Sequence, residues 1–369
     1  MYSTLLQPPN PPDEPPQLAL SAPEIKACHN YASHHFPSHT VEPTPQGACS
    51  YILLLTPFTS SNALPTILQF RLPQYALPSQ TLTLPHRVYG ALAPQTKELA
   101  SLPLSKRDGV QVLSMSCIPG SRFSDLQPGR TADLSPRDLG RMGQPMRSFA
   151  SFFAGQWATR SSSLGCDGAG GRVGGSLVTR LYRLERELPA AQLRAVAREV
   201  WEAVEAGGLD ACGLVFTHGD LLSANVIVDP ETWRIQGIVD WAESEVLSFG
   251  LGLYGLEHLL GFIGPSAVEK EGQEWIYYSQ ADELRRIFWR SFHLRIPGGF
   301  CGEGRRAVEL GFKVGVLLWH GFAWDEGRID RVVGFERDGV EVEYLYGFLG
   351  VACEGVRRDS TVEECTMVG

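Results

Sequence analysis

The sequence lacks the features that mark metal-bound, secreted or membrane-spanning proteins. Its eight cysteines are widely scattered and none forms a CxxC pair, which argues against a zinc site and against a small disulfide scaffold. It contains no apolar run of the roughly 18–20 residues that span a bilayer. The opening residues lack the basic start and apolar middle of a secretory signal. We therefore expect an intracellular, cytoplasmic protein with no membrane partner.

Positive charge is also scarce. The chain has 32 Lys and Arg residues against 41 Asp and Glu, a net charge of −9. Because phosphate backbones bind net-basic surfaces, this balance disfavours a nucleic-acid partner. The 369 residues are 43% hydrophobic, enough for one large domain or two associated ones.

Composition changes along the chain and predicts four regions. Seven prolines fall within the first 23 residues, which indicates an extended arm over residues 1–39. Short apolar runs separated by turn residues predict a β-rich region over 40–118. Helical spacing of apolar residues predicts a larger helical region over 119–354, followed by a polar tail, 355–369.

Within these regions the pattern predicts individual elements. Strands are expected at 51–55, 66–71 and 110–115. The pair Ser135-Pro136 is a typical helix start. Further helices are expected from near Pro189 to Gly207, at about 274–295 and at about 303–323.

One segment, residues 214–243, places polar side chains at the ends of short apolar runs. The first run ends at His218 and a glycine, which leaves Asp220 at a strand end. Asn225 follows five residues later, directly before a second apolar run, and a third run leads to Asp240. A strand–loop–strand–turn–strand path brings these ends together, so two carboxylates and one amide can converge.

That trio suits phosphoryl transfer. Asp220 can accept the proton of an acceptor hydroxyl, and Asn225 and Asp240 offer hard oxygen ligands to Mg²⁺ bound to ATP phosphates. The protein-kinase catalytic loop has the same Asp-x-x-x-x-Asn spacing, with a metal-binding Asp on the next hairpin.

The motifs HGDLLSAN (218–225) and IVDWAE (238–243) resemble the aminoglycoside phosphotransferase family, and within it the divergent fungal branch. The resemblance extends from about residue 40 to residue 350. It includes four shorter stretches in the β-rich region: QGACSY (46–51), LQFRLP (68–73), RVYGALAP (87–94) and MSCIPG (115–120).

The resemblance implies an α+β, protein-kinase-like fold with a small β-rich N-terminal lobe and a larger helical C-terminal lobe. It also implies ATP and Mg²⁺ as cosubstrates and a small-molecule hydroxyl as acceptor. Asp220 would be catalytic, with Asn225 and Asp240 as metal ligands. His218 would either support the Asp220 loop or act as a base, and Glu243 would be either a substrate contact or a solvated side chain. The implied nucleotide-binding residues are Gly47, Ser50, Arg71, Met115 and Cys117.

Three departures from the family pattern are visible. Arg71 stands where a nucleotide-binding Lys is expected, and the following helix, about 80–92, carries no carboxylate to pair with it. Only one glycine precedes Ser50, so there is no glycine-rich loop. The acidic residue expected about ten positions after Asp240 is missing, and Gly-Leu-Gly-Leu-Tyr (250–254) stands there. Two functions therefore stay open: a small-molecule phosphotransferase, or a non-catalytic kinase-like scaffold.

Overall fold

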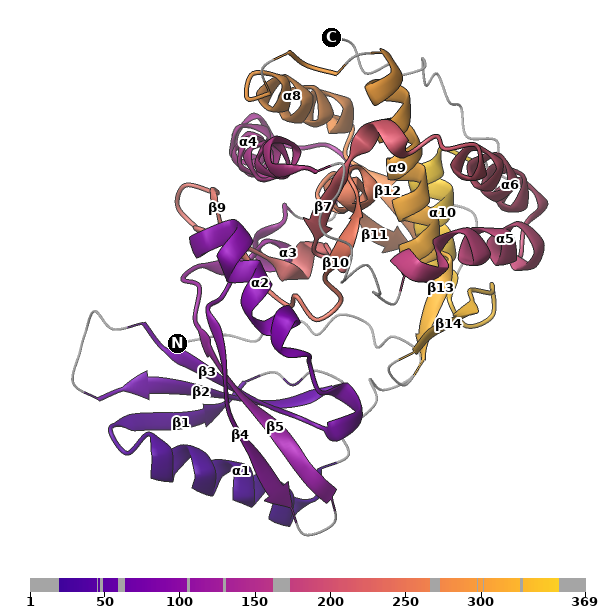
Figure 1. Ribbon diagram of the computed structural model, residues 1–369. Helices are drawn as coiled ribbons and strands as arrows, with labels where there is room; N and C mark the ends of the chain where they lie inside the picture. Colours follow the sequence, from indigo (N-terminus) through magenta and orange to yellow (C-terminus); the bar gives the residue numbers. More distant parts are fainter. Residues whose placement is uncertain are drawn as a thin grey trace. The chain divides into compact units, whose positions relative to one another are not determined.

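The described part of the chain has a mixed α+β fold, with a β-sheet in the N-terminal region and helices in most of the remainder (Figure 1). A computed structural model describes residues 20–44, 46, 49–58, 64–104, 107–128, 131–161, 173–265, 273–296, 298–300, 302–325 and 328–351. It divides into two compact units. Unit 1 comprises Met1–Leu84, Pro94–Cys117 and Glu326–Arg328, and unit 2 comprises Pro85–Ala93, Ile118–Asp325 and Ile329–Gly369.

Unit 1 is built on one antiparallel sheet with the strand order β1-β2-β3-β5-β4. The three strands predicted from apolar runs are confirmed as β2, β3 and β5. Alternate residues of β2, Tyr51, Leu53 and Leu55, are buried, as the period of two in a half-buried strand requires. The strand bounds are β1 His39–Pro43, β2 Ser50–Pro57, β3 Thr66–Arg71, β4 Thr96–Leu104 and β5 Arg107–Ser116.

The expectation of an extended arm over residues 1–39 is wrong for its C-terminal part. Helix α1, Ala22–His35, begins at a capping box. The Ser21 side chain pairs with the Glu24 backbone, and the Glu24 side chain accepts a hydrogen bond from the Ser21 amide. Cys28 and Ala32, one turn apart, are fully buried in the same core as Phe70 of β3. Figure 1 shows α1 lying along the sheet. The sequence did not reveal this helix, because prolines dominate the region and Cys28 and Ala32 are the apolar residues that the helix buries fully.

Unit 2 consists mainly of helices packed in pairs, with α4 beside α8 and α5 beside α6 (Figure 1). Helix α4 starts as predicted, because the Ser135 side chain accepts a hydrogen bond from the Asp138 amide. Phe149 and Phe153 of α4 pack edge-to-face against each other and meet Phe288 of α8. Helix α2, Ser79–Tyr89, contributes residues to both units. The helices of unit 2 are α3 Phe123–Leu126, α4 Pro136–Thr159, α5 Leu177–Glu187, α6 Ala191–Glu205, α7 Tyr254–Glu257, α8 Ala281–His293, α9 Gly302–His320 and α10 Gly339–Leu349.

The helix expected at 274–295 is wrong in its first part. Residues Gln273–Tyr277 form strand β12, paired antiparallel with β11, Gly261–Pro265, and α8 begins only at Ala281. The run Trp-Ile-Tyr-Tyr is rich in β-branched and aromatic residues, which favour strands when a partner strand is available. The distant partner, not the local apolar spacing, decided the outcome.

Short strand pairs carry the predicted functional segment. Strand β7, Leu214–Thr217, pairs with β10, Glu245–Ser248. Strands β6, Ser121–Arg122, β8, Val226–Val228, and β9, Ile235–Ile238, form a second small sheet. These pairings confirm the strands predicted between residues 214 and 239.

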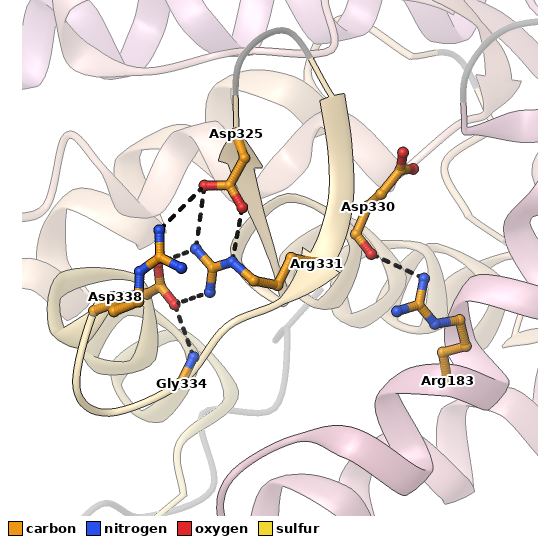
Figure 2. Close-up of polar contacts among 7 residues, drawn as sticks. Arg183, Asp325, Asp330, Arg331, Gly334 and Asp338 are labelled. Carbon is orange, nitrogen blue, oxygen red and sulfur yellow. Dashed lines mark hydrogen bonds and ion pairs between the residues drawn. The ribbon is translucent and has the colours of Figure 1, made fainter. Parts of the chain in front are cut away.

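The last hairpin of unit 2, β13 (Phe322–Asp325) and β14 (Arg328–Val332), leads into α10. Figure 2 shows the Arg331 guanidinium between two carboxylates, Asp325 at 2.7 Å and Asp338 at 2.7 Å. Asp338 also accepts the Gly334 amide hydrogen bond at 2.9 Å. This network fixes the turn before α10. Across the described residues, none of the helices combines the length and the apolar character that a bilayer crossing needs.

Candidate active site

The candidate catalytic loop begins where strand β7 ends. Gly219 has a φ of +80°, and a Cβ at this position would lie 2.0 Å from the Glu243 carbonyl oxygen. Only glycine fits this close approach of two backbones. Glu243 itself is half-buried, and its backbone supports the turn that presents Asp220.

Asp220 and Asn225 are brought into direct contact by this loop. The Asn225 side-chain amide donates to the Asp220 carboxylate Oδ2 at 3.0 Å and to the Asp220 backbone carbonyl at 2.8 Å. A short 3₁₀ turn, η5 (Ser223–Asn225), shapes the chain between them. No described residue donates a hydrogen bond to the second carboxylate oxygen of Asp220, which leaves that oxygen open to an acceptor.

Asp240 reaches the same place through the β8–β9 hairpin. Val226 pairs with Ile238, and the Val239 amide donates to the Asn225 carbonyl at 2.9 Å. The hairpin register therefore places Asn225 beside the residue that precedes Asp240. Asp240 has a φ of +63°, a left-handed conformation that Asp tolerates better than most residues.

His218 links the loop to this hairpin. Its Nε2 lies 2.8 Å from the Val239 carbonyl, and its Nδ1 lies 3.2 Å from the Asp220 amide nitrogen. One ring nitrogen must donate to the carbonyl and the other must accept from the amide, which assigns a neutral imidazole with its proton on Nε2. Burial lowers the pKa of His218 to about 4, which agrees with a neutral ring.

The pKa of the Asp220 carboxyl group lies near neutral pH. Burial, and after it the neighbouring Asp240 charge, raise its pKa to about 7 against the opposing effect of the Asn225 hydrogen bond. A carboxylate with a pKa near the working pH is suited to general-base chemistry.

An aromatic stack of Trp241 and Tyr89 packs beside the loop. Trp241 is buried, and its indole donates to the Ile238 carbonyl at 2.7 Å. Its ring stacks on Tyr89 at 4.9 Å, and the Tyr89 hydroxyl donates to the Phe216 carbonyl. Gln156 donates to that hydroxyl at 2.9 Å. Tyr89 lies in the RVYGALAP stretch, but nothing in its spacing predicted this role.

The donor set beside Asp220 fits Mg²⁺. No described residue donates a hydrogen bond to the exposed Asp240 carboxylate or to the Asn225 side-chain oxygen, and both are the hard oxygen donors that Mg²⁺ prefers. Within the described ranges, no cluster of three or more His, Cys, Asp and Glu side chains is arranged to hold a metal. Mg²⁺ needs no such cage, because one or two protein ligands and substrate phosphates complete its shell.

Unit 1 carries the predicted nucleotide-binding residues, of which two lie side by side. Ser50 pairs with Arg71 across β2 and β3. Gln69 donates to Ser50 at 2.8 Å, and Arg71 lies 3.4 Å from Gln69 and donates to the Tyr75 carbonyl at 2.7 Å. Gln69 and Arg71 share one face while Phe70 is buried on the other, as strand alternation predicts.

The remaining nucleotide-binding candidates lie elsewhere in unit 1. Met115 of β5 pairs with Ile67, four residues from Arg71 along β3, a separation of about 13 Å at the usual rise per residue. The Cys117 amide binds the Pro65 carbonyl at 3.3 Å, and burial raises the pKa of the Cys117 thiol. Gly47 lies outside the described residues.

Comparison with known families agrees with this arrangement. A sequence model of the phosphotransferase enzyme family matches residues 61–246, just over half of the chain. The chain belongs to the phosphotransferase enzyme family. The matched range includes Arg71 and the whole segment from HGDLLSAN to IVDWAE. It confirms the resemblance to the family, whereas the fungal branch stays a prediction. A sequence search of curated proteins finds no match.

Solved structures share the fold of this family member. A choline kinase from Cryptosporidium parvum Iowa II is similar at a TM-score of 0.53 and 11% identity, with 88% of this chain and 94% of that chain covered. An ethanolamine kinase from Plasmodium vivax is similar at a TM-score of 0.53 and 12% identity, with 89% of each chain covered. At these identities the likeness confirms the kinase-like α+β fold.

Proposed function

We propose that this chain transfers the γ-phosphoryl group of ATP, with Mg²⁺, to a hydroxyl group of a small molecule. The observation that carries the proposal is the contact of Asp220 with Asn225 beside Asp240. Asp220, the candidate base, and the Asn225 amide lie on one loop, and the Asp240 carboxylate follows the adjoining β8–β9 hairpin. The two similar solved structures are of a choline kinase and an ethanolamine kinase, proteins named for small-molecule acceptors, which supports the acceptor class.

In the proposed reaction the acceptor oxygen attacks the γ-phosphorus. The new O–P bond forms, the bond to the β-phosphate oxygen breaks, and ADP leaves. Asp220 orients the acceptor hydroxyl and takes its proton on the carboxylate oxygen that no described residue hydrogen-bonds. Asn225 holds the other oxygen, so the carboxylate keeps one orientation during the transfer. Such reactions depend mainly on positioning and on charge stabilisation.

Asn225 and Asp240 would hold the magnesium ion, which when bound neutralises phosphate charge as the leaving oxygen departs. His218 acts in this proposal by positioning and not as a base, since both of its ring nitrogens are already used. It ties the Asp220 amide to the Val239 carbonyl. It therefore fixes the spacing between the proposed base and the proposed metal ligand.

The proposed nucleotide-binding residues are Gly47, Ser50, Arg71, Met115 and Cys117. Arg71 offers a guanidinium in place of an ammonium, and a guanidinium can bind phosphate oxygens in pairs. Glu243, beside the Asp220 loop, is a proposed acceptor contact. Use of ATP and the thiols of Cys28 and Cys212, which form no disulfide in the structure, fit a cytoplasmic location.

A second candidate, a non-catalytic kinase-like scaffold, is favoured by one observation. Helix α2 has the sequence SQTLTLPHRVY, without an acidic residue to pair with Arg71. A scaffold could keep the Asp220 loop as a structural remnant. Binding of ATP alone would not separate the two candidates, whereas turnover does.

The deciding experiment incubates the purified full chain with γ-³²P-labelled ATP, Mg²⁺ and fractionated small-molecule extracts. We expect label to move into a small-molecule fraction, and EDTA to stop the transfer. The Asp220→Asn variant serves as the matched control in every fraction. If wild type and Asp220→Asn release or transfer label at the same rate in all fractions, the phosphotransferase proposal fails and the scaffold candidate stands.

A further inference from the structure

The candidate catalytic loop is also held by a side chain from outside its motif, that of Tyr254. The Leu221 amide, directly after Asp220, donates to the Tyr254 hydroxyl oxygen at 2.9 Å. Tyr254 begins helix α7 and is 1% exposed, and Leu221 is 2% exposed. This hydroxyl is the partner that the described structure gives to the buried Leu221 amide, a group that is costly to leave without a hydrogen bond.

Asp220 is thereby fixed on both sides. Its own amide binds His218 at 3.2 Å, and the following amide binds Tyr254. The backbone carbonyl of Asp220 accepts the Asn225 side chain and the Leu222 amide. The Asp220 amide, the Asp220 carbonyl and the Leu221 amide therefore each have a partner, and among these partners Tyr254 is the one that lies far from the loop in sequence.

The Tyr254 ring has little freedom to move. It stacks on Trp319 at 5.3 Å and 17°, and the His320 ring meets it edge-on at 5.7 Å. The next residue, Gly255, packs directly on the loop, since a Cβ there would lie 2.8 Å from the Leu221 carbonyl oxygen. The Tyr254 hydroxyl and the Gly255 backbone of α7 therefore both contact Leu221.

The character of the hydroxyl agrees with this contact. Burial keeps the pKa of Tyr254 well above its ordinary value, and the Asp220 charge acts in the same direction. A neutral phenol can accept from the amide without placing a second charge beside the Asp220 carboxylate. Tyr254 also ends the Gly-Leu-Gly-Leu-Tyr segment in which the family resemblance led us to expect an acidic residue.

We propose that Tyr254 is a positioning residue that holds the catalytic loop from the C-terminal side of Asp220. It touches neither acceptor nor nucleotide and acts through the Leu221 amide. Its effect on turnover rests on the proposed function of Asp220, whereas its hold on the loop does not. The two parts are therefore tested separately.

The first test measures the loop itself. Tyr254→Phe removes one oxygen and keeps the ring. Tyr278→Phe is the matched control, because Tyr278 is also 1% exposed and its hydroxyl donates to a backbone carbonyl, that of Pro128, at 3.3 Å. Amide hydrogen exchange of the full chain is followed by NMR or mass spectrometry. We expect exchange of the Leu221 amide to accelerate at least tenfold in Tyr254→Phe and to stay unchanged in Tyr278→Phe.

Two outcomes overturn this part. One is unchanged Leu221 exchange in Tyr254→Phe. The other is equal acceleration in both variants, which would indicate general destabilisation. If Tyr254→Phe does not fold, 3,5-difluorotyrosine at position 254 keeps the oxygen but makes it a weaker acceptor. The Leu221 amide proton should then shift upfield, and an unmoved resonance overturns the proposal.

The second test measures turnover with Mg·ATP and the labelled fraction found for the wild type. We expect kcat of Tyr254→Phe to fall by about 10–100-fold while KM for ATP stays within about twofold, because a displaced base slows the chemical step without weakening nucleotide binding. Equal loss in Tyr278→Phe, or an unchanged kcat, overturns the catalytic part. Should the wild type transfer no label, the proposed function fails, and amide exchange still decides whether Tyr254 holds the loop.

Discussion

The Asn225 side chain donates to both the carboxylate and the backbone carbonyl of Asp220, at 3.0 and 2.8 Å. One amide therefore fixes the position of the acid and the rotation of its side chain. The Asn225 side-chain oxygen receives no hydrogen bond from a described residue. Asn225 directly precedes strand β8, and the β8–β9 hairpin leads to Asp240. Asn225 thus connects the proposed base to the proposed metal ligand, and its loss would affect both.

The first prediction concerns Asp220. Asp220→Asn removes the proton acceptor but keeps the shape of the side chain. We expect kcat to fall by roughly 10²–10⁴, the range for loss of general-base help, with the melting temperature and ATP binding retained. Steady-state kinetics with labelled ATP check this result.

The matched control is Asp229→Asn. Asp229 is a half-buried residue in the turn of the β8–β9 hairpin, and its carboxylate accepts hydrogen bonds from the Glu231 and Thr232 amides. Its replacement should leave kcat unchanged. Retention of more than about a third of wild-type kcat by Asp220→Asn would remove Asp220 from the role of base.

The second prediction concerns the metal. Asp240→Asn is preferred to Ala, since Asn tolerates the left-handed backbone at this position. We expect the rise in melting temperature caused by ATP with Mg²⁺ to be lost in this variant, because a ligand stabilises only the state that binds it. Thermal-shift titrations with ATP, with and without Mg²⁺, measure the effect. An unchanged Mg²⁺-dependent shift would place the metal elsewhere.

The third prediction concerns Arg71. Arg71→Met keeps much of the buried side-chain length but removes the guanidinium. If the group binds phosphates, KM for ATP should rise about tenfold with a smaller change in kcat. Lys97→Met, which removes an exposed cation on β4 of the same sheet, is the control and should leave KM within about twofold. Equal KM values for Arg71→Met and wild type would show that another group anchors the phosphates.

The fourth prediction concerns pH and the ion pairs of Figure 2. Hydrogen bonds from Arg331 lower the pKa of Asp325. Burial is the largest single influence on the pKa of Asp338 and opposes the same shift, but the hydrogen bonds from Arg331 and Gly334 and the charges of Arg331 and Arg337 together lower that pKa too. Depressed carboxyl pKa values stabilise the fold above the unfolded value near 4, and this contribution is lost as pH falls through the folded values.

Arg331→Gln should therefore lower the melting temperature at pH 7 by about 2 °C, corresponding to roughly 1 kcal/mol for a partly exposed network. The difference from wild type should shrink as the pH falls below about 4. Arg337→Gln is the control, because Arg337 lies 3.9 Å from Asp325 and is 69% exposed. A melting difference that stays constant from pH 7 to pH 3 would contradict the assignment to these carboxylates.

The sequence by itself determined the segment that holds the site. Apolar runs of strand length, broken by turn residues, predicted β7, β8 and β9. The spacing of Asp220, Asn225 and Asp240 then placed their side chains at strand ends, because such spacing is a local property of the chain. Strand alternation likewise predicted that Gln69 and Arg71 share a face.

Tertiary structure decided what local patterns could not. Residues 273–277 form a strand and not a helix because strand β11 is available as a partner. Residues 22–35 of the proline-rich arm form helix α1, whose apolar residues pack against the N-terminal sheet. The neutral state of His218 follows from two hydrogen bonds made across the fold. The Tyr254 hydroxyl meets the Leu221 amide over 33 residues of chain. Contacts between distant segments depend on how the elements pack, and no periodicity or spacing within the chain records that packing.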